Sequence, residues 1–234
     1  MRLHRFFINQ LIKVGTKTVA VIDKSLIHQW KNVFRLKSGD ALVLLDNSGT
    51  EFQATIQNLD KTKAELNIFA AKIARNMPAK NIFLLSAIIK KDNFEWVLEK
   101  GTELGVSHFV PLLTDRTEKK DINVERGEKI IREASEQSER GRLPTLYKPM
   151  KLKEALKNID IDLVAFDPDG AKFGPEKIKL FKKIGLLIGP EGGWSEAEIE
   201  LFKDYKIPVY SIGAPVLRAE TAAIVVAALV GLSG

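Results

Sequence analysis

Two glycine-rich turns near the carboxyl end of this sequence constrain its fold more than any other feature. Both lie in residues 185–232, and each follows a short apolar run and precedes a helical pattern. Before the first turn, at 189–194, stand the apolar residues 185–188. A short run bounded by glycine and proline predicts a buried strand. Ser195 and Glu198 have the spacing of a capping box, so we expect a helix to begin there. Glycine backbone beside a helix N-terminus indicates a small-ligand site.

The second turn repeats this plan, with a strand at 207–212, a turn at 213–215 and a helix running to residue 232. Residues 222–232 carry no charge, and a helix that is apolar on all sides must be buried. We expect a partner subunit to bury this helix. Membrane insertion is the weaker interpretation, because the run is too short to span a bilayer. Arg218 and Glu220 stand beside the turn, where ionisable groups need partners or a functional role.

These residues resemble the knotted C-terminal half of the SPOUT class of RNA methyltransferases. The resemblance lies in residues 189–193 (GPEGG), 212–213 (IG) and 217–222 (LRAETA). Over nearly its whole length the chain is most similar to the RsmE family, which methylates N3 of a uridine in small-subunit (16S) ribosomal RNA. The resemblance implies an α/β fold, a SPOUT-type trefoil-knotted parallel sheet with helices on both faces, preceded by a small PUA-like β-barrel. It also implies S-adenosylmethionine as methyl donor and a homodimer with its active site at the subunit interface.

The arrangement of short patterns along the chain predicts two domains. Residues 1–72 are expected to form the PUA-like RNA-binding domain, with strands at 17–22, 41–46, 51–58 and 63–69 and a helix at 24–36. Residues 73–80 contain Arg75 to Pro78, which break any regular pattern, and are the predicted linker. Residues 81–234 are the predicted methyltransferase domain, because strand 82–89, helix 92–104 and strand 109–113 indicate a parallel sheet.

Composition excludes some classes of protein and favours others. A formal net charge of +6 suits a polyanionic partner such as RNA. The absence of cysteine excludes disulfides, cysteine-ligated zinc and a cysteine nucleophile, and the three histidines have no paired metal-binding spacing. The amino end has no long apolar segment, so we expect neither a signal peptide nor a membrane helix, and a cytoplasmic location.

The resemblance also implies roles for individual residues of the site. Arg218 would stabilise negative charge that develops on the uracil oxygens. Glu220 would accept the N3 proton, orient Arg218 or cap the helix. The donor would be bound by residues of both turns: Leu187, Ile188, Gly189, Pro190, Glu191, Gly192, Gly193, Ser211, Ile212, Gly213, Val216, Leu217 and Thr221.

Basic residues along both domains are the predicted RNA contacts. They are Arg5, Arg35, Lys37, Lys90, Arg116, Arg140, Arg142 and Lys172. Solvated surface charge remains an alternative for several of them, and capping of the helix dipole remains one for Arg140. The basic segment 172–183 is interpreted as a lid or an RNA contact.

One departure from the family pattern bears on the substrate. Ala214 and Pro215 stand where family members often have a basic residue. Either another residue supplies that charge, such as Lys172 or an arginine of a second subunit, or the target is positioned differently. Asp167 and Asp169 invite a metal interpretation, but the sequence DPDG favours a turn. A dinucleotide-dependent oxidoreductase is disfavoured, since neither turn has the required glycine spacing. A SPOUT enzyme acting on another nucleotide or a ribose hydroxyl and a non-catalytic RNA-binding assembly factor stay open.

Overall fold

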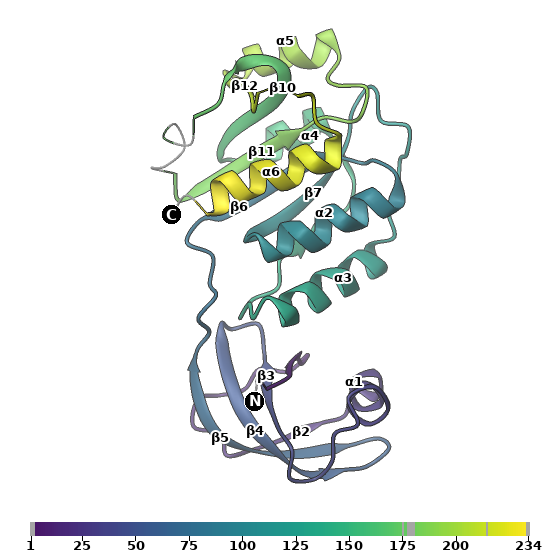
Figure 1. Cartoon of the computed structure of the whole chain (residues 1–234), viewed down its shortest axis with the longest axis vertical. Coiled ribbons are helices and arrows are strands. Elements are labelled where there is room, and N and C mark those ends of the chain that lie inside the picture. Colours follow the sequence, from purple (N-terminus) through teal and green to yellow (C-terminus); the bar gives the residue numbers. More distant parts are fainter. Residues whose placement is uncertain (1–2, 175, 177–180, 214, 233–234) are drawn as a thin grey trace. The chain divides into compact units, whose positions relative to one another are not determined.

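The computed structural model describes residues 3–174, 176, 181–213 and 215–232 (Figure 1). The chain forms two compact units, Met1–Met77 with Ser135–Leu143, and Pro78–Ala134 with Pro144–Gly234. Residues 135–143, which the sequence pattern places in the second domain, belong to the first unit in the structure. Specific polar contacts hold them there: Asn47 Oδ1 accepts a 2.7 Å hydrogen bond from the Leu143 amide, and Arg142 Nη2 donates to the Ser48 carbonyl at 2.9 Å.

The first unit contains a five-stranded sheet in the order β1-β3-β4-β5-β2. Its strands are β1 (Arg5–Phe7), β2 (Thr18–Val21), β3 (Ala41–Leu45), β4 (Thr50–Leu59) and β5 (Ala64–Ile73). The predicted helix is present as α1 (Lys24–His28), which continues directly into the π-helical turn η1 (Gln29–Val33). Asp23 caps α1 by accepting hydrogen bonds from the amides of Ser25 and Leu26. Trp30 is fully buried against Phe6, with ring centroids 5.4 Å apart, and anchors this core.

The second unit is a parallel sheet in the order β12-β10-β11-β6-β7-β8, with β9 also paired to β7. Its strands are β6 (Asn81–Ala87), β7 (Val106–Leu113), β8 (Thr145–Leu146), β9 (Met150–Lys151), β10 (Asp162–Lys172), β11 (Lys183–Ile188) and β12 (Val209–Ser211). Its helices are α2 (Lys91–Glu103), α3 (Val124–Gln137), α4 (Leu152–Asn158), α5 (Glu196–Asp204) and α6 (Ala219–Gly231). The end of α3, from Ser135 onward, belongs to the first unit. The mixed α/β class and the parallel sheet predicted from the sequence are confirmed.

Helices cover both faces of this sheet. Neighbouring residues of a strand point to opposite sides, so each face presents apolar side chains that a helical layer buries. Leu84 and Leu186 face one side, where α2, α3 and α6 pack, whereas Leu85 and Leu187 face the other, where α4 and α5 pack. The central strands are therefore apolar on both faces, as expected for a parallel sheet between two helical layers.

Helix α6 lies across β6 and β11 and beside α2 (Figure 1). Ala223, Val226 and Val230 are fully buried in this contact. Leu229 and Leu232, by contrast, are 36% and 76% exposed, so the predicted burial holds for one face of the helix within this chain. The chain thus pairs β12 with β10 at the sheet edge and then returns over β11 and β6. This path is consistent with the expected knot.

The turn predicted at residues 167–170 is instead a bulge within β10. Phe166 and Ala171 both pair with Tyr210 of β12, so the four residues between them have no partners in that register. Asp167 accepts a 3.0 Å hydrogen bond from the Asp169 amide and stabilises the bulge locally. A strand that bulges can redirect its side chains, and here Asp167 and Pro168 turn toward the site described next.

Candidate active site

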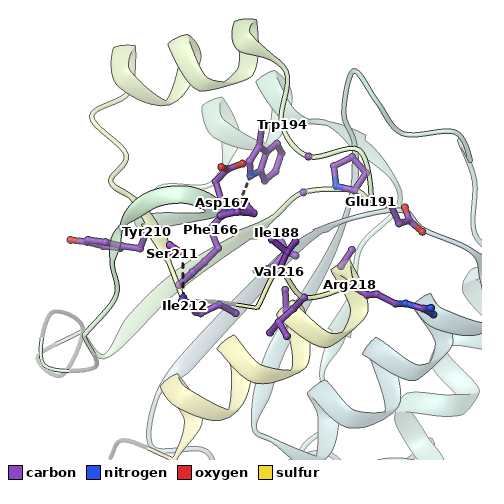
Figure 2. Close-up of a pocket in the computed structure, with 18 residues that line it drawn as sticks. Phe166, Asp167, Ile188, Glu191, Trp194, Tyr210, Ser211, Ile212, Val216 and Arg218 are labelled. Atoms are coloured by element: carbon purple, nitrogen blue, oxygen red, sulfur yellow. Dashed lines mark hydrogen bonds between the residues drawn. The ribbon is translucent and has the colours of Figure 1, made fainter.

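A cavity of about 310 Å³ opens beside the bulge of β10 and the loops that follow β11 and β12 (Figure 2). Ligand sites of open α/β sheets lie at the carboxyl ends of the strands. Here Ile188 ends β11, Ser211 ends β12, and Arg218 precedes α6. The wall of the cavity comprises Phe166, Asp167, Pro168, Ile188, Gly189, Pro190, Glu191, Gly193, Trp194, Tyr210, Ser211, Ile212, Gly213, Val216, Leu217, Arg218, Ala219 and Ala222.

Most residues predicted to bind the donor are brought together in this wall, although the two turns are separated in sequence. Three of them are not part of it. Leu187 packs in the core on the opposite face of the sheet, since it alternates with Ile188. Gly192 belongs to the outer side of its loop, beside Arg116. Thr221 does not line the cavity, whereas Ala219 and Ala222, which share a helix face, do.

The first glycine turn, residues 189–193, is held in shape by Trp194. Its indole Nε1–H donates a 2.9 Å hydrogen bond to the Phe166 carbonyl (Figure 2). A Cβ atom at Gly189 would lie 3.1 Å from the indole ring, which is tighter than ordinary contact. Gly193 has φ +71°, a left-handed conformation that favours glycine. The capping box predicted after this turn is confirmed, with Ser195 and Glu198 bonded reciprocally at the start of α5.

The cavity is mainly apolar, with few charged groups at its margin. Arg218 is exposed at the N-cap of α6, and Glu191 is exposed in the first turn. Figure 2 shows both side chains extending outward from the cavity, on the same side of the view. Asp167 is half-buried in the wall. Two carboxylates and a guanidinium therefore border a pocket whose interior is largely hydrocarbon, the usual character of a small-molecule site.

Glu220, the second predicted catalytic residue, lies elsewhere. It is 5% exposed, does not line the cavity, and its Oε2 has no hydrogen-bond partner among the described residues. Arg218 is the N-cap of α6, with extended backbone, and lines the cavity, whereas Glu220 lies in the first turn of the helix and does not. The helix N-terminus, with its free amides, favours a carboxylate at this position. This placement favours the structural role over that of a proton acceptor.

Five of the predicted RNA contacts lie in the first unit, and three of them, Arg5, Arg140 and Arg142, are paired or buried inside it. Arg5 Nη2 is 3.2 Å from Glu139 and Arg5 Nε is 3.7 Å from Glu51, with only 11% of the arginine side chain exposed. Arg140 is 4% exposed, and burial lowers its pKa to about 10. Arg142 donates through Nε and Nη2 to the Ser48 carbonyl. The contacts of Arg5 and Arg142 and the burial of Arg140 favour structural roles for the three arginines.

The other predicted RNA contacts lie at the surface. Arg35 and Lys37 are exposed in the segment that follows η1, where Arg35 has φ +55°. In the second unit, Lys90 is exposed at the N-cap of α2, and Arg116 Nη1 donates a 2.6 Å hydrogen bond to the Gly192 carbonyl. Lys172, also exposed, pairs in register with Ser211 of the cavity wall. Residues 175 and 177–180 of the expected lid, and Ala214 of the second turn, lie outside the described residues.

Several cavity residues were not predicted from the sequence, namely Phe166, Asp167, Pro168, Trp194, Tyr210, Ala219 and Ala222. The DPDG motif directly after a short apolar run was a usable signal, because a bulged strand can redirect its side chains toward a site. Trp194 had a weaker signal as an aromatic residue at the end of a glycine turn. Ala219 and Ala222 had none beyond the helical spacing.

Neither a metal-binding cluster nor a membrane-spanning helix is found in the part of the chain that the structure describes. No group of three or more histidine, aspartate or glutamate side chains is placed to hold a metal ion in residues 3–174, 176, 181–213 and 215–232. Over the same residues, no helix combines the length and apolar character that crossing a bilayer requires.

Comparison with known proteins gives a consistent family assignment. Residues 75–231 match the model of an RNA methyltransferase domain, and residues 31–69 match that of an RNA methyltransferase PUA domain. The chain is 32% identical to ribosomal RNA small subunit methyltransferase E of Rickettsia conorii, with 100% of this chain and 97% of the relative covered. It is also 32% identical to the protein of that name from Bacillus subtilis, with 84% and 83% covered.

Solved structures agree with these relatives. A ribosomal RNA small subunit methyltransferase E from Neisseria gonorrhoeae, bound to S-adenosylmethionine, has a TM-score of 0.88 and 26% identity, with 97% of this chain and 96% of that chain covered. A protein of Legionella pneumophila, solved with bound S-adenosylmethionine, has a TM-score of 0.90 and 28% identity, with 100% and 99% covered. The chain therefore belongs to the ribosomal RNA small subunit methyltransferase E family.

Proposed function

We propose that this protein transfers a methyl group from S-adenosylmethionine to N3 of a uridine in the 16S RNA of the small ribosomal subunit. The observation that carries the proposal is the cavity formed by the two glycine turns, in a chain that is similar from end to end to structures with S-adenosylmethionine bound. The choice of the uridine N3 atom rests on the resemblance of residues 189–193, 212–213 and 217–222 to the family.

The residues of the cavity fit this donor. A volume of about 310 Å³ lies at the lower end of the range for small-molecule pockets. Ile188, Ile212 and Leu217 supply apolar surface for an adenine ring. Asp167 and Glu191 supply the negative charge that suits a cationic sulfonium and an ammonium group. When bound, the donor would supply a methyl group that is activated by its positively charged sulfur.

In this proposal the protein's contribution to chemistry is mainly positioning and electrostatics. N3 of uracil loses its proton to water and forms the new bond to the methyl carbon, while the carbon–sulfur bond breaks and its electron pair stays on sulfur. Arg218 stabilises the negative charge on the uracil oxygens, which lowers the cost of losing the proton. Since N3 lies on the base-pairing edge, the target uridine must be unpaired or turned out of its stack.

Lys172 is our candidate for the positive charge that the family often has at positions 214–215. It is exposed at the end of β10 and lies opposite Ser211, which lines the cavity. A lysine there would attract the RNA phosphates that flank the target uridine. Arg35 and Lys37, exposed within the PUA match, would supply further contacts to RNA phosphates.

We further propose that two copies of the chain associate through α6. Its outward residues Leu229 and Leu232 remain exposed on an otherwise apolar helix, and solvent exposure of such a face is unfavourable. The resemblance implies an active site at the subunit interface, where an arginine of the second subunit is the alternative to Lys172. The cytoplasmic location stays a prediction.

The deciding experiment uses 16S RNA and small subunits from a bacterial strain that lacks the enzyme. Incubation with the protein and S-adenosylmethionine should place one methyl group on N3 of one uridine, identified by mass spectrometry of nuclease fragments. Methylation of a ribose hydroxyl or of another base would reject the N3 assignment. RNA binding without any binding of S-adenosylmethionine in calorimetry would favour the assembly-factor alternative. Separate reactions with free RNA and with subunits identify the substrate.

A further inference from the structure

We propose that Asp115 and Arg116, in the loop after β7, are positioning residues that hold the glycine turn 189–193 in its donor-binding shape. This role replaces the RNA contact predicted for Arg116 from the sequence. The inference rests on the proposed function, since it concerns affinity for the methyl donor. It goes beyond the proposed function because residues outside both glycine turns would determine the affinity for the methyl donor.

Arg116 contacts the outer side of the glycine turn. Its Nη1 donates a 2.6 Å hydrogen bond to the Gly192 carbonyl oxygen, and its Cδ lies 3.4 Å from the position of a Cβ atom on Gly192. Gly192 does not line the cavity, whereas its neighbours Glu191 and Gly193 do. The guanidinium thus holds the turn from behind and leaves its inner side open to a ligand.

Asp115 links the same loop to the helix that follows the turn. Its amide donates a 3.0 Å hydrogen bond to Glu198 Oε1, and its Oδ2 accepts a 2.5 Å hydrogen bond from Ser195 Oγ. Glu198 Oε2 in turn accepts from the Ser195 amide at 2.9 Å, and Glu198 is 5% exposed. A capping box normally joins residues of one helix start. Here it also includes a loop some eighty positions away in sequence.

These contacts matter because the turn is rich in glycine. Glycine backbone has more conformational freedom than that of any other residue, and ordering it on binding reduces affinity. Trp194 fixes the turn at one point through Phe166, and Ser195 fixes its end through Asp115. Gly192 lies before both of these points, where the hydrogen bond from Arg116 constrains the backbone. Loss of the contact made by Arg116 or by Asp115 should therefore lower the affinity for the donor more than the rate of methyl transfer.

The test compares full-length variants by calorimetry with S-adenosylhomocysteine and by anisotropy with a fluorescent 16S RNA fragment. Arg116→Ala and Asp115→Ala should each raise Kd for S-adenosylhomocysteine about fivefold, the order expected for one charged hydrogen bond at a partly solvated site. RNA affinity should stay within about twofold. In turnover, KM for S-adenosylmethionine should rise while kcat at saturation stays close to its original value, a split that a general loss of folding does not produce.

Two further variants make the result decisive. Asp115→Asn keeps an oxygen that can accept from Ser195 and should restore most of the affinity lost in Asp115→Ala. Arg126→Ala removes a surface arginine whose Nε lies 3.4 Å from Glu95 Oε2, and should change neither Kd. An unchanged donor Kd in Arg116→Ala, with weaker RNA binding, would overturn the inference and restore the RNA assignment. No binding of S-adenosylhomocysteine by the unaltered protein would overturn the proposed function itself, and this inference with it.

Discussion

The indole of Trp194 donates its Nε1–H to the carbonyl oxygen of Phe166 at 2.9 Å, which joins the first glycine turn to β10. The ring is 5% exposed and meets Phe202 edge-on, with centroids 5.0 Å apart. Phe166 directly precedes the bulge that turns Asp167 into the cavity wall. One buried side chain therefore fixes two segments of the site relative to each other.

Trp194→Phe should destabilise the protein by about 2 kcal/mol, because it leaves the Phe166 carbonyl without this donor and shortens a buried ring. Urea unfolding measures the change. Trp96→Phe provides the matched control, since Trp96 of α2 is 48% exposed and its replacement should have little effect. Equal losses in the two variants would contradict the importance assigned to the buried indole.

Gly189→Ala should weaken donor binding about tenfold with a stability loss of only about 1 kcal/mol. The added methyl group would lie 3.1 Å from the Trp194 ring, so either the turn or the ring must shift. The backbone at Gly189 is outside the left-handed region, and the effect therefore comes from crowding. Calorimetry with S-adenosylhomocysteine, combined with thermal unfolding, separates the two effects. Unaltered donor affinity would show that the turn adapts without cost.

Arg218→Ala should lower kcat about a hundredfold, because it removes the charge proposed to stabilise the uracil anion. Donor affinity should change much less, and Arg218→Lys should retain part of the activity, since the positive charge remains. Single-turnover methylation of 16S RNA measures the chemical step directly. Full turnover by Arg218→Ala would reject the proposed role of this residue.

Glu220→Gln should behave differently and keep kcat within about threefold, since the carboxylate is buried and outside the cavity wall. The same single-turnover assay, run at several pH values, measures the rate of methyl transfer by this variant. A collapse of activity together with loss of one limb of the pH profile would identify Glu220 as the proton acceptor after all.

His108 should make the protein less stable as the solution becomes acidic. Partial burial, and secondly the charge of Lys183, hold the pKa of His108 below its ordinary value of 6.5. The unfolded chain therefore binds a proton more readily, and the free energy of unfolding falls as pH drops from about 6.5 toward the folded-state pKa. His108→Gln should flatten this part of the stability profile, measured by urea unfolding between pH 7 and pH 5. An unchanged slope would mean that other groups cause it.

The exposed side of α6 gives a prediction about assembly. Light scattering after gel filtration should give about twice the 26.1 kDa mass of one chain. Leu229→Glu should shift the protein to the monomer, because it places a charge on the proposed apolar interface. Leu11→Glu is the control, since Leu11 of the first unit is 82% exposed and should leave the mass unchanged. A monomer for the unaltered protein would reject the proposed dimer.

Local patterns in the sequence were sufficient for much of the fold. The spacing of Ser195 and Glu198 predicted the start of α5, and the apolar run around Leu186 predicted β11, because capping and strand burial depend on near neighbours. The DPDG motif gave a wrong prediction of a turn, because its structure depends on a distant strand. Its turn chemistry is local, but pairing of Phe166 and Ala171 with Tyr210 incorporates the motif into β10 as a bulge.

For the candidate site, the sequence determined the two glycine turns, the apolar α6 and the position of Arg218 at its start. Which residues share one cavity was decided only by the tertiary structure, which places Asp167 in the wall, buries Glu220 outside it and directs Arg116 to the Gly192 carbonyl. The physical reason is that side-chain direction depends on strand register and helix phase. Both are set by packing between segments far apart in the chain, and no local pattern records them.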